Sequence, residues 1–390
     1  MKRFLLAAAI LPGLLAAEGH ADDAVKIGII MPYSGQFADP AAQSDSGIKL
    51  YLKQHGDKLG GRTVEFIRKD VGGINPPVAK RLAQELVTRD NVDILTGFQL
   101  TPNALAAADV SAEAKKFMVV LNAATAIVTT KSPYMVRVSF TIAQLNQTLG
   151  TWAEQQGLKS AYTMVTDYGP GIDAEAAFHK GFKEAGGEIV GSVRMAVQSP
   201  DFSAYVQRAK DLNPHGIFIM IPGGAQPGAF GKALAERGID PQKIEILGQA
   251  EITDEHALAS MGDVAVGIIT ASHYDWNHRS PMNEEFVRAY NAEYHRNPDF
   301  FSVGGYDGMH LIDLALQKTG GRTDGEALVE AAKGTSWDSP RGPMSIDPQT
   351  RDVVQTVYIR RVENVGGRLV NVEIAAVPNV KDPFKAAMKP

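Results

Sequence analysis

The chain has 390 residues, a formal net charge of −5 and a sequence pI near 6.0. This charge balance argues against nucleic-acid binding, which needs a concentrated basic surface. The chain has no cysteine, which excludes disulfides, thiolate metal sites and a cysteine nucleophile, and its length predicts two domains.

The N-terminal residues 1–21 are predicted to form a secretory signal peptide. Lys2 and Arg3 supply positive charge, and the apolar stretch 4–17 that follows is short for a membrane span. Small residues precede Asp22, where we expect cleavage. No cysteine follows, which argues against a lipid anchor, and no later stretch is apolar for 18 residues. We therefore expect a free periplasmic protein that does not span the membrane.

Two series of strand-like segments follow. Residues 25–31 form a near-continuous apolar run, typical of a strand that is covered on both faces. The other candidates of the first series are 63–70, 93–98, 116–122 and 134–140, and those of the second are 160–167, 187–195, 216–222, 244–249 and 265–274. Residues 353–362 and 368–374 read as a hairpin around two glycines.

Helix-like segments lie between the strands. A capping residue followed by proline predicts helix starts at Asn75-Pro76, Asp39-Pro40, Thr101-Pro102 and Ser280-Pro281. Apolar stripes at 286, 289, 290 and 294 and at 309, 312 and 316 predict core-facing helices. The alternation predicts an α/β fold with mostly parallel sheets flanked by helices.

Six segments together resemble the leucine/isoleucine/valine-type periplasmic binding proteins of ABC transporters: 25–52, 97–113, 120–126, 167–178, 201–210 and 304–316. The resemblance covers nearly all of the chain after residue 21. It implies the type I periplasmic binding protein fold, with two lobes, three hinge crossings near 139–142, 272–274 and 341–345, and a ligand clamped between the lobes. Lobe 1 would comprise 24–140 plus 275–342, and lobe 2 would comprise 141–270 plus 345–390.

The same resemblance implies a role and a set of partners. It implies a non-enzymatic carrier whose closed form docks on a membrane permease, which the sequence itself does not show. We expect a small-molecule carboxylate as ligand, a monomer, and neither cofactor nor metal. His273 and His278 lack the spacing of a metal site.

One end of the predicted cleft is suited to a carboxylate. Strand C-termini and helix N-termini face the cleft in such folds, so Gln99, Leu100 and Thr101 would lie there, where unpaired N–H groups and the helix dipole favour an anion. In the resembled family the next turn, here Ala123, Ala124 and Thr125, holds the ligand carboxylate. The alternative is that Thr101 and Thr125 merely cap their own helices.

Other candidates would form the cleft walls. Tyr33, Gln36 and Phe37 follow the first strand, although they could equally be surface residues. Tyr168 matches the family's aromatic residue over the ligand. Its segment 167–176 lacks the lysine of a P-loop and the third glycine of a dinucleotide fingerprint, which argues against nucleotide binding.

Two departures from the family bear on the ligand. The slot of a family tyrosine is Ala225, and the slot of the glutamate that pairs with an amino acid's ammonium is Ala250, with Glu251 one position further from the strand that ends at Gln249. A buried ammonium needs an anion opposite it. If Glu251 points away, the ligand would be a larger carboxylate without an amine.

These departures favour an aromatic or phenylpropanoid acid as ligand, with His273 and Tyr274 near a crossing as further contacts. A branched-chain amino acid or amide is the alternative. A periplasmic hydrolase or oxidoreductase is disfavoured because no nucleophile elbow, zinc motif or cofactor fingerprint is present, and a sensor ectodomain because no signalling domain is attached.

Overall fold

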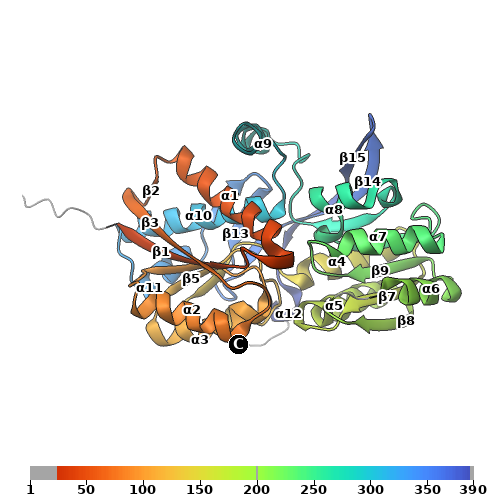
Figure 1. Ribbon diagram of the computed structural model, residues 1–390, viewed down its shortest axis with the longest axis horizontal. Helices are drawn as coiled ribbons and strands as arrows, with labels where there is room; N and C mark the ends of the chain where they lie inside the picture. Colours follow the sequence, from red (N-terminus) through yellow and green to blue (C-terminus); the bar gives the residue numbers. More distant parts are fainter. Residues whose placement is uncertain (1–23, 199–200, 387–390) are drawn as a thin grey trace, which may run out of the picture.

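Each of the two lobes is built on one β-sheet, and the lobes lie side by side (Figure 1). The computed structural model describes residues 24–198 and 201–386. The predicted signal peptide at 1–21 lies outside the described residues. The predicted two-lobed α/β fold is confirmed.

The sheet of the first lobe has six strands in the order β2-β3-β1-β4-β5-β6. All neighbours are parallel except β2 and β3, which are antiparallel. The strands are β1 (Val25–Met31), β2 (Lys58–Leu59), β3 (Arg62–Asp70), β4 (Ile94–Gly97), β5 (Phe117–Val120) and β6 (Met135–Arg137).

Helices cover both faces of this sheet, which explains the apolar run of β1. Ile29 packs in a core with α1 (Ala38–Gln54), α10 (Phe300–Thr319) and α11 (Gly325–Ala332), whereas Ile30 packs on the opposite face with α2 (Pro76–Thr88) and α3 (Thr101–Ala114). Burial of each such side chain contributes about 1.5–3 kcal/mol. A strand that is buried on both faces cannot alternate apolar with polar residues.

The second sheet has nine strands and is mixed. Strands β8, β7, β9, β10 and β11 are parallel neighbours, whereas β14 runs antiparallel to β11, β13 and β15. The bounds are β7 (Ser160–Thr166), β8 (Glu188–Met195), β9 (Gly216–Met220), β10 (Glu245–Gln249), β11 (Ile269–Ser272), β12 (Ser336–Ser339), β13 (Gly342–Ile346), β14 (Val353–Val365) and β15 (Arg368–Val380). The predicted C-terminal hairpin is confirmed as β14 and β15.

Helices also cover both faces of this second sheet. One core joins it to α4 (Ile142–Gln155) and α5 (Gly169–Ala185), and another joins it to α6 (Phe202–Leu212), α7 (Gln226–Arg237) and α8 (Glu255–Met261). The remaining elements are α9 (Pro281–Tyr294), α12 (Pro383–Ala386), η1 (Gly35–Phe37), η2 (Val128–Thr130), η3 (Ala250–Thr253) and η4 (Gly262–Ala265).

In the described chain, segments pass between the lobes after β6, after β11 and between α11 and β14. Strands β12 and β13 connect the lobes: they hydrogen-bond through β14 to the nine-stranded sheet, while Trp337 and Ile346 pack in the core of the first lobe. The residue bounds given above for each lobe stay a prediction.

The predicted helix starts have two outcomes. Asn75 and Ser280 cap α2 and α9 as expected, with side chains that accept hydrogen bonds from backbone N–H groups. The capping roles predicted for Asp39 and Thr101 are wrong, because α1 begins at Ala38 and α3 begins at Thr101 itself. Thr101 therefore lies inside the first turn of α3, with its hydroxyl free of the capping role.

Candidate ligand-binding site

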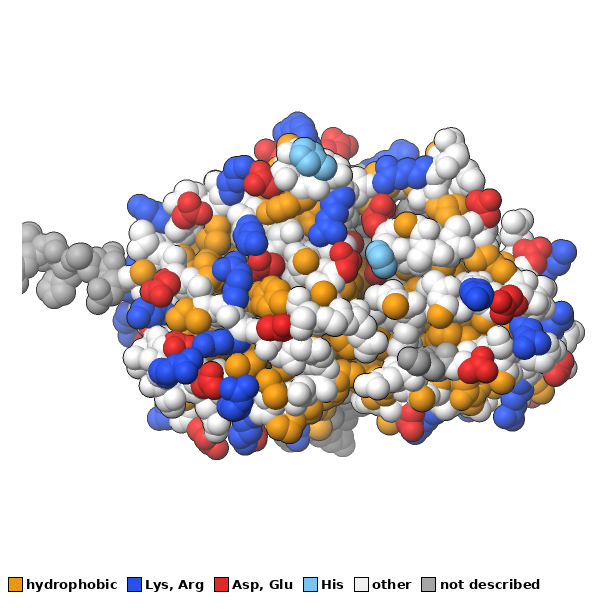
Figure 2. Space-filling model, in the orientation of Figure 1, with side chains coloured by type: hydrophobic (Ala, Val, Ile, Leu, Met, Phe, Trp, Pro, Cys, Tyr) orange, Lys and Arg blue, Asp and Glu red, His pale blue; other side chains and the backbone are white. Residues whose placement is uncertain are grey.

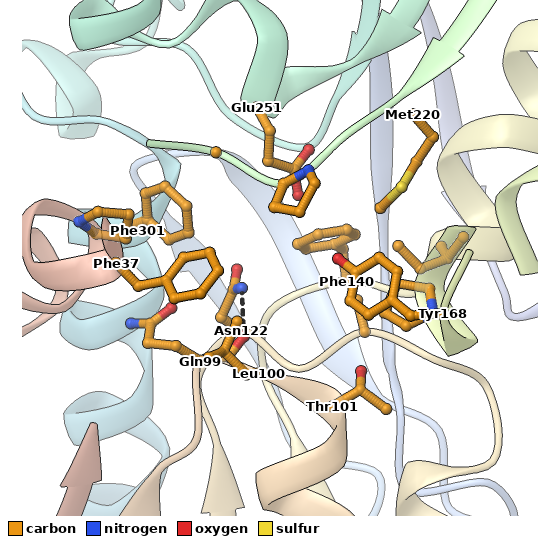
Figure 3. A pocket seen from close by; sticks show the side chains of 16 residues that line it. Phe37, Gln99, Leu100, Thr101, Asn122, Phe140, Tyr168, Met220, Glu251 and Phe301 are labelled. Atoms are coloured by element: carbon orange, nitrogen blue, oxygen red, sulfur yellow. Dashed lines mark hydrogen bonds between the residues drawn. The ribbon is translucent and has the colours of Figure 1, made fainter. Parts of the chain in front are cut away.

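A cavity lies between the two lobes, at the ends of parallel strands from both sheets. It spans about 540 Å³, counting space that is open to solvent. Figure 3 shows its side chains, and the lining residues are Phe37, Pro40, Gln99, Leu100, Thr101, Asn122, Ala124, Phe140, Ile142, Tyr168, Pro170, Met220, Pro222, Gly223, Glu251 and Phe301.

The turn after β4 brings the start of α3 to the cavity. Gly97 and Phe98 both have left-handed backbone conformations, with φ of 106° and 63°. A Cβ at Gly97 would lie 2.5 Å from the carbonyl oxygen of Ile30, so glycine is required there. The carbonyl of Phe98 accepts a hydrogen bond from the N–H of Ala123 at 2.9 Å, which fastens this turn to the turn after β5.

The two turns meet at a pair of threonines. The hydroxyl of Thr125 donates to the hydroxyl of Thr101 at 3.0 Å, and both side chains are buried. Among the described residues, the N–H groups of Thr101, Ala124 and Thr125 have no acceptor. Free N–H groups beside a helix N-terminus attract a negative charge. This lobe 1 end of the cavity is therefore chemically suited to a carboxylate.

A buried arginine holds the turn after β5 in place. Arg137 donates through Nη1 to the carbonyls of Ala123 and Thr125 at 3.1 and 2.8 Å, and through Nη2 to the carboxylate of Asp352 at 2.7 Å. The side chains of Arg137 and Asp352 are 0% and 1% exposed, and Lys385 also pairs with Asp352. Because Arg137 occupies the carbonyls, the turn can direct its N–H groups toward the cavity.

Aromatic side chains form the walls. Phe37, Phe140, Tyr168 and Phe301 line the cavity from different elements and surround its centre in Figure 3. Phe301 lies against Phe300, with ring centroids 4.0 Å apart. Such walls suit a flat apolar ligand, because aromatic rings pair favourably in offset-stacked or edge-to-face arrangements.

Glu251 occupies the lobe 2 end of the cavity. It belongs to η3, is 7% exposed, and receives a hydrogen bond from Nε2 of Gln249 at 3.1 Å. Burial raises the pKa of the Glu251 carboxyl above its ordinary value. Burial, with the nearby charge of Glu251, also raises the pKa of Tyr168, which keeps its hydroxyl neutral.

The lobes contact each other around the cavity. The N–H of Ala126 in the first lobe donates to Asp173 of α5 at 3.1 Å. On another side of the cavity, a Cβ added at Gly224 would lie 2.6 Å from the carbonyl oxygen of Gln36. A side chain at position 224 would therefore hold the lobes apart, which is consistent with the closed arrangement seen here.

The structure places the predicted site residues in three groups. Seven line the cavity: Phe37, Gln99, Leu100, Thr101, Ala124, Tyr168 and Glu251. Ala123, Thr125 and Gln249 support these lining residues through the hydrogen bonds described above. Tyr33, Gln36, Ala225, His273 and Tyr274 do not line it.

The residues of the third group have other contacts. The hydroxyl of Tyr33 faces Asp45, and that of Tyr274 donates to Asn283 at 2.9 Å. His273 stacks on Phe140 behind the wall with a centroid distance of 4.8 Å, and burial lowers the pKa of its imidazole well below the ordinary value. Gln36 and Ala225 are exposed.

Sequence reasoning missed several lining residues, namely Pro40, Asn122, Phe140, Ile142, Pro170, Met220, Pro222, Gly223 and Phe301. Asn122 was detectable, because it directly follows a predicted strand, and its side chain donates to the carbonyl of Gln99 at 2.9 Å. Phe140, Met220 and Phe301 gave no separate signal, since an aromatic or apolar residue in a core has the same local pattern.

The position of Glu251 was left open by the sequence. Glu251 lies one position after the slot of the family glutamate, so its carboxyl could have pointed away from the ligand. The structure places it in the cavity wall. The η3 turn after β10 produces this placement, because it redirects the chain directly after Gln249. The cavity therefore does contain an anionic group, and the offset alone is no argument against a ligand with an ammonium group.

Two kinds of feature are absent from the described residues. No three histidine or acidic side chains of residues 24–198 and 201–386 are grouped so as to hold a metal ion. Within the same ranges, no helix has the length and apolarity that crossing a bilayer requires. Figure 2 shows acidic and basic side chains interspersed over both lobes on the face in view.

Comparison with known proteins adds to this geometry. The family profile described as periplasmic binding protein matches residues 24–367. Leu/Ile/Val-binding protein homolog 6 of Brucella abortus (strain 2308) is 41% identical over 387 residues, which are 98% of this chain and 99% of the relative.

Two solved structures are similar along nearly their whole length. A solute binding protein of an ABC transporter from Rhodopseudomonas palustris BisB5, in complex with 3,4-dihydroxy benzoic acid, is 48% identical with a TM-score of 0.90, covering 93% of this chain and 99% of that one. A second solute binding protein of an ABC transporter, from Rhodopseudomonas palustris HaA2 in complex with p-hydroxybenzoic acid, is 38% identical with a TM-score of 0.90. The match covers 94% of this chain and 100% of that one. Together with the two-lobed fold and its cavity, these matches establish that the chain belongs to the periplasmic binding protein family.

Proposed function

We propose that this protein is the solute-binding component of an ABC importer and that it carries an aromatic carboxylate between its lobes. The observation that carries this proposal is the cavity itself, which combines aromatic walls with three free N–H groups at its lobe 1 end. The similarity to proteins in complex with dihydroxy- and p-hydroxybenzoic acid supports the same ligand class.

The ligand would enter with its carboxylate toward Thr101, Ala124 and Thr125. Its ring would then lie among Phe37, Phe140, Tyr168 and Phe301. Burial of about 150–250 Å² of aromatic surface is worth about 4–6 kcal/mol. Charge-assisted hydrogen bonds add about 1.5–3 kcal/mol each, so micromolar affinity remains after the cost of association.

Binding would be coupled to closure of the lobes. Lobe 1 supplies the carboxylate contacts, and lobe 2 adds Tyr168, Met220 and Glu251 when it covers the ring. A ligand shifts a two-state equilibrium by its extra contacts in the favoured state. The contact of Ala126 with Asp173 belongs to the closed form in this scheme.

The cellular role completes the proposal. The protein would be exported by the signal peptide at 1–21, act in the periplasm as a monomer, and deliver its ligand to a membrane permease. The relatives are named as binding proteins, which supports transport rather than catalysis. The closing units would be the predicted lobes, 24–140 plus 275–342 and 141–270 plus 345–390.

A branched-chain amino acid is the second candidate. Glu251 favours it, because this carboxylate could pair with an ammonium, and because the Brucella relative is named a Leu/Ile/Val-binding protein homolog. The aromatic walls favour the aromatic acid.

A thermal-shift screen separates the two candidates. The ligand-free protein, expressed from residue 22, would be melted with benzoate, 4-hydroxybenzoate, cinnamate, leucine and isoleucine. A ligand at 100 times its Kd stabilises the protein by about 2.7 kcal/mol. For a chain of this size, this stabilisation raises the melting temperature by several degrees or less. Stabilisation by the aromatic acids is expected, and stabilisation by leucine alone would refute the proposal.

A further inference from the structure

We propose that Glu251 recognises a ring hydroxyl at the lobe 2 end of the cavity, so that the protein selects hydroxylated aromatic acids over unsubstituted ones. This inference rests on the proposed function, and it adds the feature of the ligand that decides specificity. Three features support it: the position of Glu251 in the cavity, the hydrogen bond that orients its carboxyl, and the ligand groups that can form a hydrogen bond with that carboxyl.

The location of Glu251 is set by two elements of lobe 2. It follows β10 in the η3 turn and lies across the cavity from Thr101 in Figure 3. A ligand whose carboxylate is bound at Thr101 would therefore present the far edge of its ring to Glu251. Glu251 is 7% exposed, so bulk water cannot replace a hydrogen-bond partner that its carboxyl lacks.

A chain of amide groups holds the Glu251 carboxyl. Asn146 of α4 donates through Nδ2 to the carbonyl of Ile142 at 2.9 Å and to Oε1 of Gln249. Because the oxygen of the Gln249 amide is occupied, its NH₂ group faces Glu251, where it donates to Oε2 at 3.1 Å. The donor-to-acceptor order of these hydrogen bonds thus makes Oε2 of Glu251 an acceptor.

The carboxyl has capacity for one more partner. A carboxylate can accept about four hydrogen bonds, and Gln249 is the side chain that donates to it among the described residues. Apart from Glu251 itself, the cavity residues that come from lobe 2 are Ile142, Tyr168, Pro170, Met220, Pro222 and Gly223, and no lysine or arginine is among the lining residues. A ligand group is therefore free to supply the partner.

A hydroxyl fits this position better than the alternatives. It can donate to the ionised carboxylate and can accept from the protonated form, whereas an ammonium fits the ionised form alone. The protonated form is favoured by burial, which raises the pKa of Glu251. An unsubstituted ring edge would leave the buried carboxyl with Gln249 as its one side-chain partner among the described residues and its remaining capacity unused, which is costly.

The test is calorimetric titration of benzoate and 4-hydroxybenzoate into the wild type, Glu251→Leu and Glu251→Gln. We expect the wild type to bind 4-hydroxybenzoate at least about 10-fold more tightly than benzoate. Glu251→Leu should abolish this preference while it retains benzoate within about 3-fold. Glu251→Gln keeps one acceptor oxygen and should retain part of the preference, and it serves as the test if the leucine variant does not fold.

Glu255→Gln is the matched control, because Glu255 lies four residues further on in α8 and does not line the cavity. It should leave both affinities unchanged. Equal affinity of the wild type for the two acids, or an equal loss of both in the Glu251 variants, would overturn the inference alone. A wild type that binds neither acid but binds leucine would overturn the proposed function as well.

Discussion

The two ends of the cavity are built in different ways. The lobe 1 end consists of backbone N–H groups and two threonine hydroxyls on turns that Arg137 and Phe98 hold together. The lobe 2 end consists of one acidic side chain, Glu251, held by Gln249. A site made of backbone N–H groups recognises the carboxylate that all ligands of this class share. A site made of one side chain can change its ligand preference through a single substitution. The first end should therefore set affinity for carboxylates, and the second should set the choice among them.

The largest expected effect is on the support of the lobe 1 end. Arg137→Met would leave the carbonyl of Ala123 unpaired, take one of two donors from the carbonyl of Thr125, and remove one partner of buried Asp352. We expect a loss of about 3–5 kcal/mol in the free energy of unfolding, measured by chemical denaturation.

The matched control for this change is Arg194→Met. Arg194 pairs with Glu175 but is 46% exposed, so its loss should cost about 1 kcal/mol or less. If Arg137→Met cost no more than this control, the buried arginine would not be the support that we describe.

The next effect is on carboxylate affinity itself. The double variant Thr101→Val and Thr125→Val removes both hydroxyls and keeps the side-chain shape. Calorimetry should show about 10- to 100-fold weaker binding, by the same factor for benzoate and for 4-hydroxybenzoate.

Thr88→Val is the control, since Thr88 is an exposed residue of α2 whose hydroxyl donates within its own helix. A loss confined to the hydroxylated acid would reverse the roles that we assign to the two ends of the cavity.

A further expected effect depends on pH and concerns an acidic residue near the lobe 2 end. Asp299 caps α10 through Oδ1, which accepts from the N–H of Ser302 at 2.9 Å, while its Oδ2 is buried without a partner among the described residues. Burial raises the pKa of Asp299 to about 7, and the charges of Asp39 and Arg296 act on it in opposite directions. Asp254 of lobe 2 lines the same small cavity, and the charge of Asp299 contributes to its raised pKa.

The sign of the pH effect follows from linkage. The folded state holds the Asp299 proton more tightly than the unfolded state does, so this group lowers stability as the pH rises from about 4 to about 7. Asp299→Asn keeps the cap and removes the charge. Relative to the wild type it should gain stability across this range, on the order of 1 kcal/mol for each pH unit.

Denaturation at pH 5 and pH 8 measures this difference. The matched control is the same substitution at Asp324, an exposed cap of α11. A difference between wild type and Asp299→Asn that did not change with pH would contradict the assignment of a destabilising charge to Asp299.

The sequence predicted most of the framework because its central strands, such as β1, β4, β5, β7 and β9, are buried on both faces. Such strands appear as apolar runs, and their order defined both sheets and the final hairpin. It missed β2, β12 and β13, which are short and carry no apolar run: the segment that forms β12 reads Ser-Trp-Asp-Ser. Their pairing depends on neighbouring strands that are distant in the sequence.

The candidate site was predictable only in part. Thr101 and Ala124 follow strand ends, so topology alone places them together at the cavity. The sequence did not reveal that Phe140 and Phe301 line the cavity. A side chain that faces the other lobe and a side chain inside a core are both apolar, so their sequence patterns are the same. The direction of Glu251 depends on a single 3-10 turn, and a shift of one residue in that turn changes which side chain faces the ligand.

The most direct measurement is a crystal structure of the protein in complex with 4-hydroxybenzoate. The account predicts the ligand carboxylate within hydrogen-bond distance of Thr101 and of the N–H groups of Ala124 and Thr125, with its hydroxyl at Glu251. A carboxylate bound in lobe 2, or a ligand bound outside the cavity between the lobes, would contradict it.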